Sequence, residues 1–437
     1  MENEVSSAGE FETGETREGV LENQADRFQT RSEEGMNILL VSQNFYPEIG
    51  SAANRMKNVF KRLERRGNSV HVLTSEPIYP NAEIYTDSIF WDEPSLDESR
   101  ITRIRPRRRN STANLWRRLR VFIDQFLLAV KEVRNDDRSY DCIYATTPSI
   151  FMGFVGVIAK RIKKAPLVLD VRDLWPESLI GVGITKSRFL LTPLYFLERL
   201  LYREADQIII NSEGFAGYIE KSGVSPEKIH YVPNSIEENE WLIKRRKKSD
   251  RVRVIYTGNI GLAQDLFLLL DVAKQFVGEE GIEFRVVGYG YHKQQFEKMI
   301  AERGLKNVQF LEAMPRWDAL KELAASDIAF ATLVPSTAFD TVTPGKLIDY
   351  MAMGCALVGS VSGHAAHVIE ESGAGVVSRD RDAEQIARYI RELAQDPERR
   401  KRMGEAGVKY VTEHFDWEQN EEKLFTALSS VRREVRA

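Results

Sequence analysis

The sequence predicts an α/β protein with two consecutive Rossmann-like domains, each built on a doubly wound parallel sheet. Three observations favour this fold class. Short apolar runs recur along the chain, segments with helical periodicity lie between many of them, and a polar, basic stretch near residues 237–250 divides the runs into two series. Apolar strands that alternate with helices are typical of a parallel sheet with both faces covered.

The composition is that of a soluble globular protein, with 43% hydrophobic and 29% charged residues in a chain of 437. This length has room for two or three domains. The only cysteines, Cys142 and Cys355, argue against a disulfide framework and for a reducing compartment. No apolar run reaches the roughly 18 residues of a membrane-spanning helix, and the polar, acidic opening residues do not resemble a signal peptide. We therefore expect a cytoplasmic protein.

The charge is unevenly distributed along the chain. Residues 1–35 contain ten acidic and three basic side chains, a balance of −7, so the remainder carries +3 of the net charge of −4. The same segment has few large apolar residues, and such segments do not bury enough apolar surface to fold. We expect residues 1–35 to be a disordered acidic tail without a role in the chemistry.

The apolar runs of the first series predict six strands, with helices such as 54–67, 149–163 and 188–204 between them. These strands are 37–43, 69–75, 141–148, 166–173, 207–213 and 228–234. The second series predicts strands at 251–259, 282–288, 308–313, 328–333, 356–361 and 373–378. Charged helices are predicted at 382–396, 397–413 and 417–435. The expected organisation is a tail at 1–35, a first domain at 36–236, a linker at 237–250, a second domain at 251–414, and a C-terminal helix at 415–437 that could pack back on the first domain.

The loops that follow the strands should hold the chemistry, because open α/β sheets bind ligands beyond the carboxyl ends of their strands. In the first domain, Gly50 and Ser51 follow the first predicted strand and precede a helix, with Arg55 in its first turn. In the second domain, glycines after two strands would let the backbone approach a bulky ligand. These glycines are Gly258, Gly261, Gly288 and Gly290.

The segment TPGKLIDYMAMG predicts a helix with an anion site at its start. Thr343 can cap this helix, Pro344 suits its first turn, and Gly345 leaves backbone N–H groups bare at the positive end of the helix dipole. Such an end binds phosphate, and Lys346 adds a full positive charge. Asp349, one turn later on the same face, can accept a hydrogen bond from a sugar hydroxyl. The combination suits a nucleotide diphosphate, and the alternative is an ordinary capped helix with a surface Lys346–Asp349 pair.

The segment VLDVRDLWPES places charged side chains at the end of a first-domain strand. A carboxylate there could hydrogen-bond or deprotonate a hydroxyl of an acceptor substrate, and Asp173 is our candidate for this role. The alternative is that Asp173 caps the following turn while Trp175 and Pro176 pack. The acceptor-side candidates beside it are Asp170, Arg172 and Glu177.

Several stretches together resemble the family 4 glycosyltransferases, which have the GT-B fold, and more narrowly the branch with N-acetyl-L-fucosamine transferases of O-antigen and capsule assembly. The similarity runs from about Met36 to His414. VLDVRDLWPES and FDTVTPGKLIDYMAMGCALVGS are specific in combination. The other matching stretches are YPEIGSAANR, HVLTSEPIYP, LYREADQIIINSEGF, GVSPEKIHYVPNS, YTGNIGLAQDL and GHAAHVIEESGAG.

This resemblance implies a nucleotide-diphosphate sugar donor, with UDP as the expected nucleotide, held mainly by the second domain. It implies that the first domain holds a glycan or a polyprenyl-diphosphate-linked acceptor in cell-surface polysaccharide synthesis. An N-acetylated amino sugar would be transferred, with retention of configuration, in the cleft that the two domains face. Lys346 and the backbone at Gly345 would contact the diphosphate, and Asp349 the ribose. The remaining donor residues that the resemblance implies are Asn259, the Gly288–Gly290 loop, and Gly50 and Ser51, which close over the phosphates.

The chain departs from the pattern of many relatives at two places. Many of them have two glutamates eight positions apart; here Asp349 replaces the second, and Thr341 stands at the first, with Asp340 one residue away. The arginine that is common in the TGNIG loop is Asn259. Both departures lie where the donor sugar and its phosphates should bind.

Transfer requires positive charge near the oxygen that leaves with the diphosphate. Lys346, the helix start and Arg55 could provide this charge without a metal ion, and we expect no metal site and no cofactor. A DxD-type pair is not found in a strand-end loop of the sequence, because Asp380 and Asp382 follow the last strand and open a helix, where a capping role is expected.

A basic cluster accompanies an apolar amphipathic helix predicted at 119–133. This combination suits the surface of an anionic membrane, which would place the protein peripherally on the inner face of the plasma membrane. The alternative is a core helix with a solvated basic edge. The cluster consists of Arg103, Arg105, Arg107, Arg108, Arg109, Arg117, Arg118 and Arg120.

Two other functions stay open on the sequence. A nucleotide-sugar epimerase of the same fold would use the same donor pocket without an acceptor, and a non-catalytic membrane-surface scaffold would transfer nothing. Binding of nucleic acid is not expected, because the chain lacks a recognition-helix motif, interleaved surface aromatics and an overall basic balance.

Overall fold

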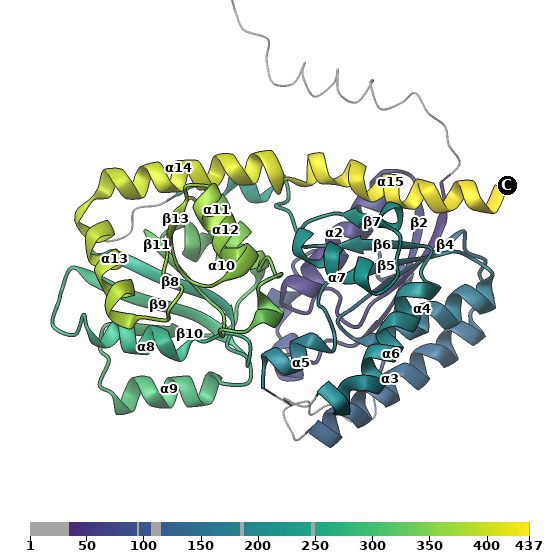
Figure 1. Cartoon of the computed structure of the whole chain (residues 1–437), viewed down its shortest axis with the longest axis horizontal. Helices are drawn as coiled ribbons and strands as arrows, with labels where there is room; N and C mark the ends of the chain where they lie inside the picture. The colour runs from purple at the N-terminus through teal and green to yellow at the C-terminus, as the bar shows by residue number, and fades with distance from the viewer. Residues whose placement is uncertain (1–34, 94–95, 106–114, 184–187, 246–249, 437) are drawn as a thin grey trace, which may run out of the picture. The chain divides into compact units, whose positions relative to one another are not determined.

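The computed structural model describes residues 35–93, 96–105, 115–183, 188–245 and 250–436. From Met36 onward the chain forms one compact unit that contains two parallel sheets. Figure 1 labels their strands and the helices that cover them. The prediction of two doubly wound parallel-sheet domains is confirmed.

The first sheet has the strand order β3-β2-β1-β4-β5-β6-β7, and every pairing is parallel. Its strands are β1 (Asn37–Val41), β2 (Ser69–Ser75), β3 (Ile101–Ile104), β4 (Cys142–Thr146), β5 (Leu167–Val171), β6 (Gln207–Ile210) and β7 (Ile229–Tyr231). The helices of this half are α2 (Ser51–Arg65), α3 (Leu115–Asn135), α4 (Ile150–Lys163), α5 (Glu177–Gly181), α6 (Arg188–Glu204) and α7 (Ala216–Lys221).

One strand of this sheet, β3, is absent from the predicted set. It has four residues, ITRI, at the edge of the sheet, and only its first and last residues are buried. Two apolar residues within a charged stretch are too weak a pattern to mark a strand, because pairing with β2 rather than its own sequence defines it.

The second sheet has the order β10-β9-β8-β11-β12-β13, again with parallel pairings. Its strands are β8 (Val252–Asn259), β9 (Ile282–Tyr289), β10 (Val308–Leu311), β11 (Ile328–Thr332), β12 (Ala356–Ser360) and β13 (Gly375–Val377). Its helices are α8 (Phe267–Lys274), α9 (Lys293–Glu302), α10 (Arg316–Ala324), α11 (Gly345–Ala352), α12 (Gly363–Glu371) and α13 (Ala383–Gln395). Asp382 accepts hydrogen bonds from the first turn of α13, so the expected capping role is confirmed.

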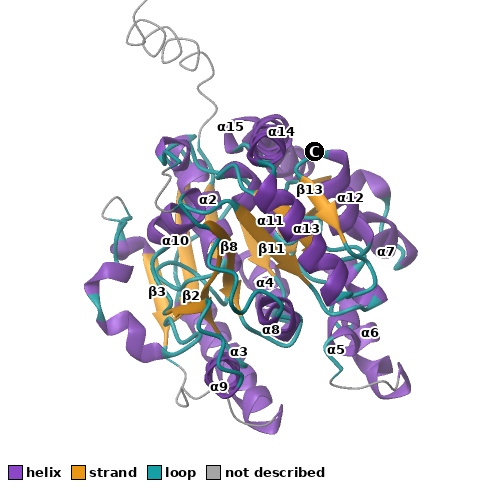
Figure 2. Cartoon of the chain, turned by 90° about the vertical axis from the view of Figure 1, so that its left-hand side faces the viewer, coloured by secondary structure: helices purple, strands orange, loops and turns teal. Residues whose placement is uncertain are grey.

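Both sheets are buried on two faces, which explains why their strands are continuously apolar. In β1, Leu39 and Val41 belong to the core under one layer of helices, while Ile38 and Leu40 belong to the core on the opposite face. The second sheet has the same arrangement, with α10, α11 and α12 contributing to one core and α8, α9 and α13 to the other (Figure 2). Alternate residues of each strand therefore face different helix layers.

The segment between the domains is packed where the structure describes it. Glu237 and Glu240 are buried, and Glu240–Leu242 forms a short 3-10 turn. Arg245 donates a hydrogen bond to the Ser326 carbonyl at 3.0 Å. These two acids, which contributed to the expectation of a polar linker, pair with the half-buried cations Lys57 and Arg316. Residues 246–249 lie outside the described residues.

The chain returns to the first sheet at its end. Helix α14 (Pro397–His414) contacts α11 and β12, and α15 (Trp417–Arg436) contacts β4 to β7. Figure 1 shows the two helices following one another from the second domain to the first. Where they meet, the Ile236 N–H donates to the Phe415 carbonyl at 2.9 Å, so both connections between the domains lie side by side.

None of the described helices combines the length and the apolar character that a membrane crossing would require.

Candidate active site

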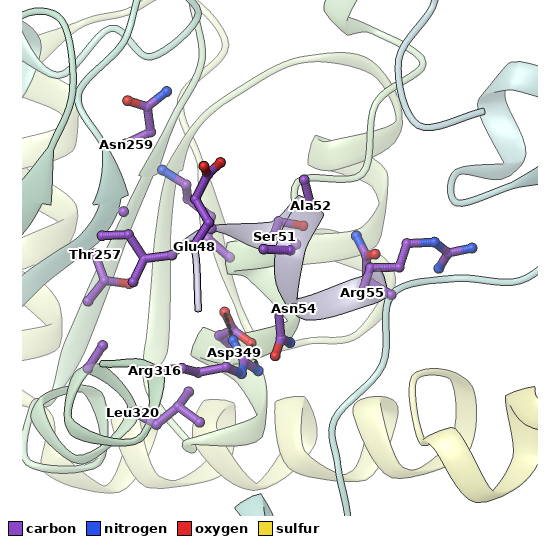
Figure 3. A pocket seen from close by; sticks show the side chains of 18 of the residues that line it. Glu48, Ser51, Ala52, Asn54, Arg55, Thr257, Asn259, Arg316, Leu320 and Asp349 are labelled. Carbon is purple, nitrogen blue, oxygen red and sulfur yellow. Dashed lines mark hydrogen bonds and ion pairs between the residues drawn. The ribbon is translucent and has the colours of Figure 1, made fainter. Parts of the chain in front are cut away.

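A cavity of about 1070 Å³ is lined by loops that follow strands of both sheets and by the start of α11 (Figure 3). Its volume is at the upper end of the range of small-ligand sites, roughly 300–1,000 Å³. The loops after β1 and β8 enter it where the strand order of each sheet reverses, the position at which open α/β sheets bind ligands. The predicted residues that line it are Gly50, Ser51, Arg55, Arg172, Asp173, Gly258, Asn259, Pro344, Gly345, Lys346 and Asp349.

Lys346 stands in the first turn of α11 with its ammonium group turned to the cavity floor. Its Nζ donates to the hydroxyl of Tyr256 at 2.6 Å and lies 3.9 Å from the centroid of that ring. The Tyr256 hydroxyl donates in turn to the Asn259 carbonyl at 2.6 Å. Burial lowers the pKa of Lys346 to about 7, with Asp349 opposing this shift. The surface Lys346–Asp349 pair that the sequence allowed is not formed among the described ion pairs.

The start of α11 differs from the expectation in its cap. Pro344, not Thr343, is the N-cap, and no side chain accepts a hydrogen bond from the first turn. Thr343 is instead buried, and its hydroxyl lies 3.1 Å from the Ser212 hydroxyl of the first domain. The first-turn N–H groups therefore lack a side-chain cap, which leaves this helix end suited to an anion.

Glycines bring the loops of both domains close to this helix end. A Cβ at Gly345 would lie 3.1 Å from Ser51 Oγ, so any larger residue there would press on the start of α2. Gly50 has φ +128° and faces the Tyr289 hydroxyl, and Gly258 has φ +117° and faces Lys346 Nζ. The structure thus gathers five of the predicted donor residues around one point.

Asp349 is held by an arginine that the sequence reasoning missed. Arg316, the first residue of α10, donates to Asp349 at 2.8 and 3.2 Å, and its other side contacts Glu240, with Nη2 at 3.0 Å from Glu240 Oε2. Figure 3 shows Arg316 beside Asp349 at the cavity wall. The available signal was a basic residue three positions after the predicted strand at 308–313.

Asn259 lies at the cavity surface, whereas the two glycines at the end of β9 do not. Asn259 lines the cavity and accepts a hydrogen bond from the Tyr79 hydroxyl of the first domain at 2.6 Å. Gly288 and Gly290 do not line the cavity. They are required by packing, because a Cβ would lie 2.5 Å from Ile260 Cδ1 at Gly288 and 2.1 Å from Asn259 Oδ1 at Gly290. These two glycines therefore let the end of β9 pack against Asn259 and Ile260, outside the cavity lining.

Arg55 lines the cavity, but it is held in a buried ion pair with Asp170. Arg55 Nε donates to Asp170 Oδ2 at 2.8 Å, its Nη1 donates to the Pro233 carbonyl at 3.0 Å, and the Tyr144 hydroxyl donates to the same Asp170 oxygen at 2.6 Å. Both charged side chains are at most 1% exposed. In Figure 3 the guanidinium of Arg55 points away from Glu48 and Thr257. Asp170 does not line the cavity, and the Arg55 charge is already balanced.

The other residues of the VLDVRDLWPES segment separate into two groups. Arg172 and Asp173 line the cavity, whereas Glu177 does not and accepts a hydrogen bond from the Tyr195 hydroxyl at 2.6 Å. Burial raises the pKa of Asp173 to about 6, while the Ser178 hydroxyl and the Leu174 N–H oppose this shift. Asp173 therefore both holds the following turn, as the alternative proposed, and faces the cavity.

Glu48 is a second residue that the sequence reasoning missed. It lines the cavity, is buried, and accepts hydrogen bonds from the Ile78 and Tyr79 N–H groups at 3.0 and 3.3 Å. Burial raises the pKa of its carboxyl group to about 7. An acid in the loop after the first strand was the available signal. Its position fixes the Tyr79 loop that reaches Asn259.

Comparison with known proteins finds similarity over both halves of the chain. Residues 50–235 match the family described as "Glycosyl transferase 4-like domain", and residues 237–410 match "Glycosyl transferases group 1". Over 338 residues the chain is 24% identical to "Putative colanic acid biosynthesis glycosyl transferase WcaI" of Escherichia coli. The aligned region covers 73% of this chain and 82% of WcaI.

Solved structures share the fold of the whole described unit. Sucrose-phosphate synthase from Thermosynechococcus elongatus superposes with a TM-score of 0.72 at 16% identity, over 92% of this chain and all of that one. HepE from Anabaena, in complex with UDP-glucose, superposes with a TM-score of 0.63 at 17% identity, over 90% of this chain and all of that one. At these identities the likeness establishes a common two-domain architecture.

Proposed function

The chain is a family 4 glycosyltransferase with the GT-B fold, and on that premise we propose that it transfers an N-acetylated amino sugar from a UDP-linked donor. The acceptor in this proposal is a glycan or a polyprenyl-diphosphate-linked saccharide of cell-surface polysaccharide synthesis. The observation that carries the donor assignment is the Lys346 ammonium at the start of α11, which has no carboxylate partner among the described residues and faces a cavity. The UDP-glucose complex of HepE and the naming of WcaI for colanic acid biosynthesis support the nucleotide and the pathway class.

The proposed reaction separates a sugar from its diphosphate. The bond between the anomeric carbon and the diphosphate oxygen breaks, and its electron pair leaves with that oxygen. Positive charge fixed in advance at this oxygen lowers the barrier, because it interacts most strongly with the charge that develops in the transition state. In this proposal Lys346 and the uncapped start of α11 supply that charge, and the transfer proceeds with retention and without a metal ion.

We place the acceptor hydroxyl next to Asp173. Its oxygen forms the new bond to the anomeric carbon, and its proton passes to the Asp173 carboxylate. With a pKa raised to about 6 by burial, Asp173 is mostly ionised at pH 7 and is a better base than an exposed aspartate. Asp349, held by Arg316, accepts from the ribose hydroxyls.

The test of this function is an assay with a panel of UDP-sugars, run with and without a lipid-linked saccharide acceptor. Transfer that requires the acceptor supports the proposal. Interconversion of UDP-sugars without an acceptor would instead identify an epimerase, and the absence of both reactions would favour a non-catalytic scaffold.

The affinity for UDP should fall as the pH rises from 7 to 9. The pKa of Lys346 lies near 7 in the free protein, and a bound diphosphate favours the ammonium form, so binding takes up a proton in this range. Isothermal titration calorimetry at several pH values, in buffers of different ionisation enthalpy, measures both effects. The Lys346→Arg variant is the control, because arginine stays charged throughout. An affinity that is equally independent of pH in both proteins would contradict the shift.

We further propose that α3 rests on an anionic membrane surface, peripherally on the inner face of the plasma membrane. On this helix Ile123 and Leu127 are 41% and 59% exposed, and Arg120 is exposed nearby. The residues Arg107, Arg108 and Arg109 of the basic cluster lie outside the described residues, as do the side chains of Arg117 and Arg118. Exposed apolar groups beside arginines suit such a surface.

Replacing Leu127 by glutamate should reduce sedimentation with anionic liposomes several-fold, as should replacing Arg107, Arg108 and Arg109 together by glutamate. Removing an inserted apolar group and adding a like charge both weaken attraction to anionic lipid. The matched control is Val277→Glu, at a 55% exposed apolar residue of the second domain. Unchanged liposome binding of both variants would rule the membrane surface out.

A further inference from the structure

The cavity contains six lysine and arginine side chains, and the protein itself balances the charge of four of them. Arg55 pairs with Asp170, Lys57 with Glu237, Arg316 with Asp349 and Lys321 with Asp318, at distances between 2.8 and 3.1 Å. A cation that already has a carboxylate gains little from a ligand anion. The two that remain are Lys346 and Arg172, which form no ion pair with any described carboxylate.

Arg172 is poorly satisfied by the protein. The one hydrogen bond that its guanidinium makes within the described part of the chain runs from Nη2 to Ser51 Oγ at 3.3 Å, and its Nε is buried without a partner. Burial lowers the pKa of Arg172 to about 10, with the nearby Arg55 cation in the same direction and Asp170 and Asp173 opposing it. A half-buried charge of this kind is costly until an anion approaches.

Arg172 and the start of α11, which carries Lys346, come together from different domains. Arg172 follows β5 of the first sheet and touches Ser51; Ser51 Oγ lies 3.1 Å from where a Cβ of Gly345 would be, and Lys346 follows Gly345 in α11. The uncapped helix start, the hydroxyl of Ser51 and the guanidinium of Arg172 are therefore neighbours. Asn259 on the facing loop contributes no charge.

We infer that Arg172 is the second cation of the donor site, so that it binds the same nucleoside diphosphate as Lys346 but from the first domain. This assignment rests on the proposed function and moves Arg172 from the acceptor side to the donor side. Its planar guanidinium can make two parallel hydrogen bonds to phosphate oxygens, which a lysine cannot. Because the two cations belong to different domains, a diphosphate bound to both would link the two domains.

The test compares the affinities for UDP and UMP by isothermal titration calorimetry at pH 7. Arg172→Gln should weaken UDP binding about ten- to a hundredfold, the range for a hydrogen bond to a charged group. It should change UMP binding less than about threefold, because UMP lacks the distal phosphate. Arg172→Lys should recover part of the loss, and it carries the test if Arg172→Gln does not fold. The matched control is Lys298→Gln, at an exposed lysine of α9 outside the cavity, which should leave both affinities unchanged.

The outcomes separate this inference from the proposed function. If the wild-type protein binds no nucleoside diphosphate, both are wrong. If the wild type binds UDP and Lys346→Gln weakens binding, while Arg172→Gln leaves UDP affinity unchanged and raises only the KM of the acceptor, Arg172 belongs to the acceptor and this inference alone is overturned. Equal losses for UDP and UMP would also contradict it.

Discussion

Replacing Lys346 by alanine is expected to lower kcat/KM about a thousandfold while the protein stays folded. The ammonium group faces the cavity from the start of α11 and makes no ion pair among the described residues. Removal of one group that stabilises the charge developing in a transition state costs roughly a hundred- to a thousandfold in rate. In the proposed donor site Lys346 also contacts the diphosphate in the ground state, so UDP affinity should fall as well.

Stability should not account for that loss. The pKa of Lys346 is lowered to about 7 in the folded protein, below its usual value of 10.5. A lowered amine pKa means that the charged Lys346 side chain reduces the free energy of unfolding. This destabilisation is present below about pH 7 and is lost as the pH rises towards 10.5. At pH 7 the alanine variant should therefore melt no earlier than the wild type. Lys298→Ala, at an exposed lysine of α9, is the control for activity. Activity of Lys346→Ala within a few-fold of the wild type would count against its role.

Replacing Asp170 by alanine is expected to destabilise the protein by about 3–5 kcal/mol, because it leaves the Arg55 charge buried without its partner. The Tyr144 hydroxyl loses its acceptor in the same step. Urea denaturation followed by fluorescence or circular dichroism measures the change in the free energy of unfolding.

Two further variants test whether the loss of stability in Asp170→Ala comes from the unpaired, buried Arg55 charge. The double variant Arg55→Met with Asp170→Leu should be less destabilised than Asp170→Ala, since no unpaired charge remains. Glu370→Gln breaks an exposed pair with Arg379 and should change stability by less than about 1 kcal/mol. A loss below about 1 kcal/mol for Asp170→Ala would show that Arg55 finds another partner or is hydrated.

Periodicity predicted most of the fold because it is a local property of the chain. The strands β1, β2 and β8 lie inside their predicted runs, and α4, α13 and α14 begin and end within one residue of prediction. The edge strand β3 could not be found in this way, because pairing with β2 defines it. Burial of Glu237 and Glu240 was likewise hidden, since their partners lie in α2 and α10, far away in sequence.

In the candidate site, too, features that depend on neighbouring residues could be predicted, whereas ion pairs between residues far apart in the sequence could not. The prediction of an anion site at Gly345 and Lys346 rests on their own local sequence, and the structure places both residues at the cavity, where the start of α11 has no side-chain cap. The pairing of Arg55 with Asp170 joins residues 115 positions apart, and that of Arg316 with Asp349 joins residues 33 positions apart. From the sequence, three of these four side chains (Arg55, Asp170 and Asp349) are predicted as separate ligand contacts, because local patterns at helix starts and strand ends do not show which charges neutralise one another.

The most direct test of the account is a crystal structure of the protein with UDP. The diphosphate should lie at the start of α11, with oxygens within hydrogen-bond distance of Lys346 Nζ and of the first-turn N–H groups, and with the ribose hydroxyls at Asp349. A nucleotide bound elsewhere in the molecule, with the start of α11 unoccupied, would contradict it.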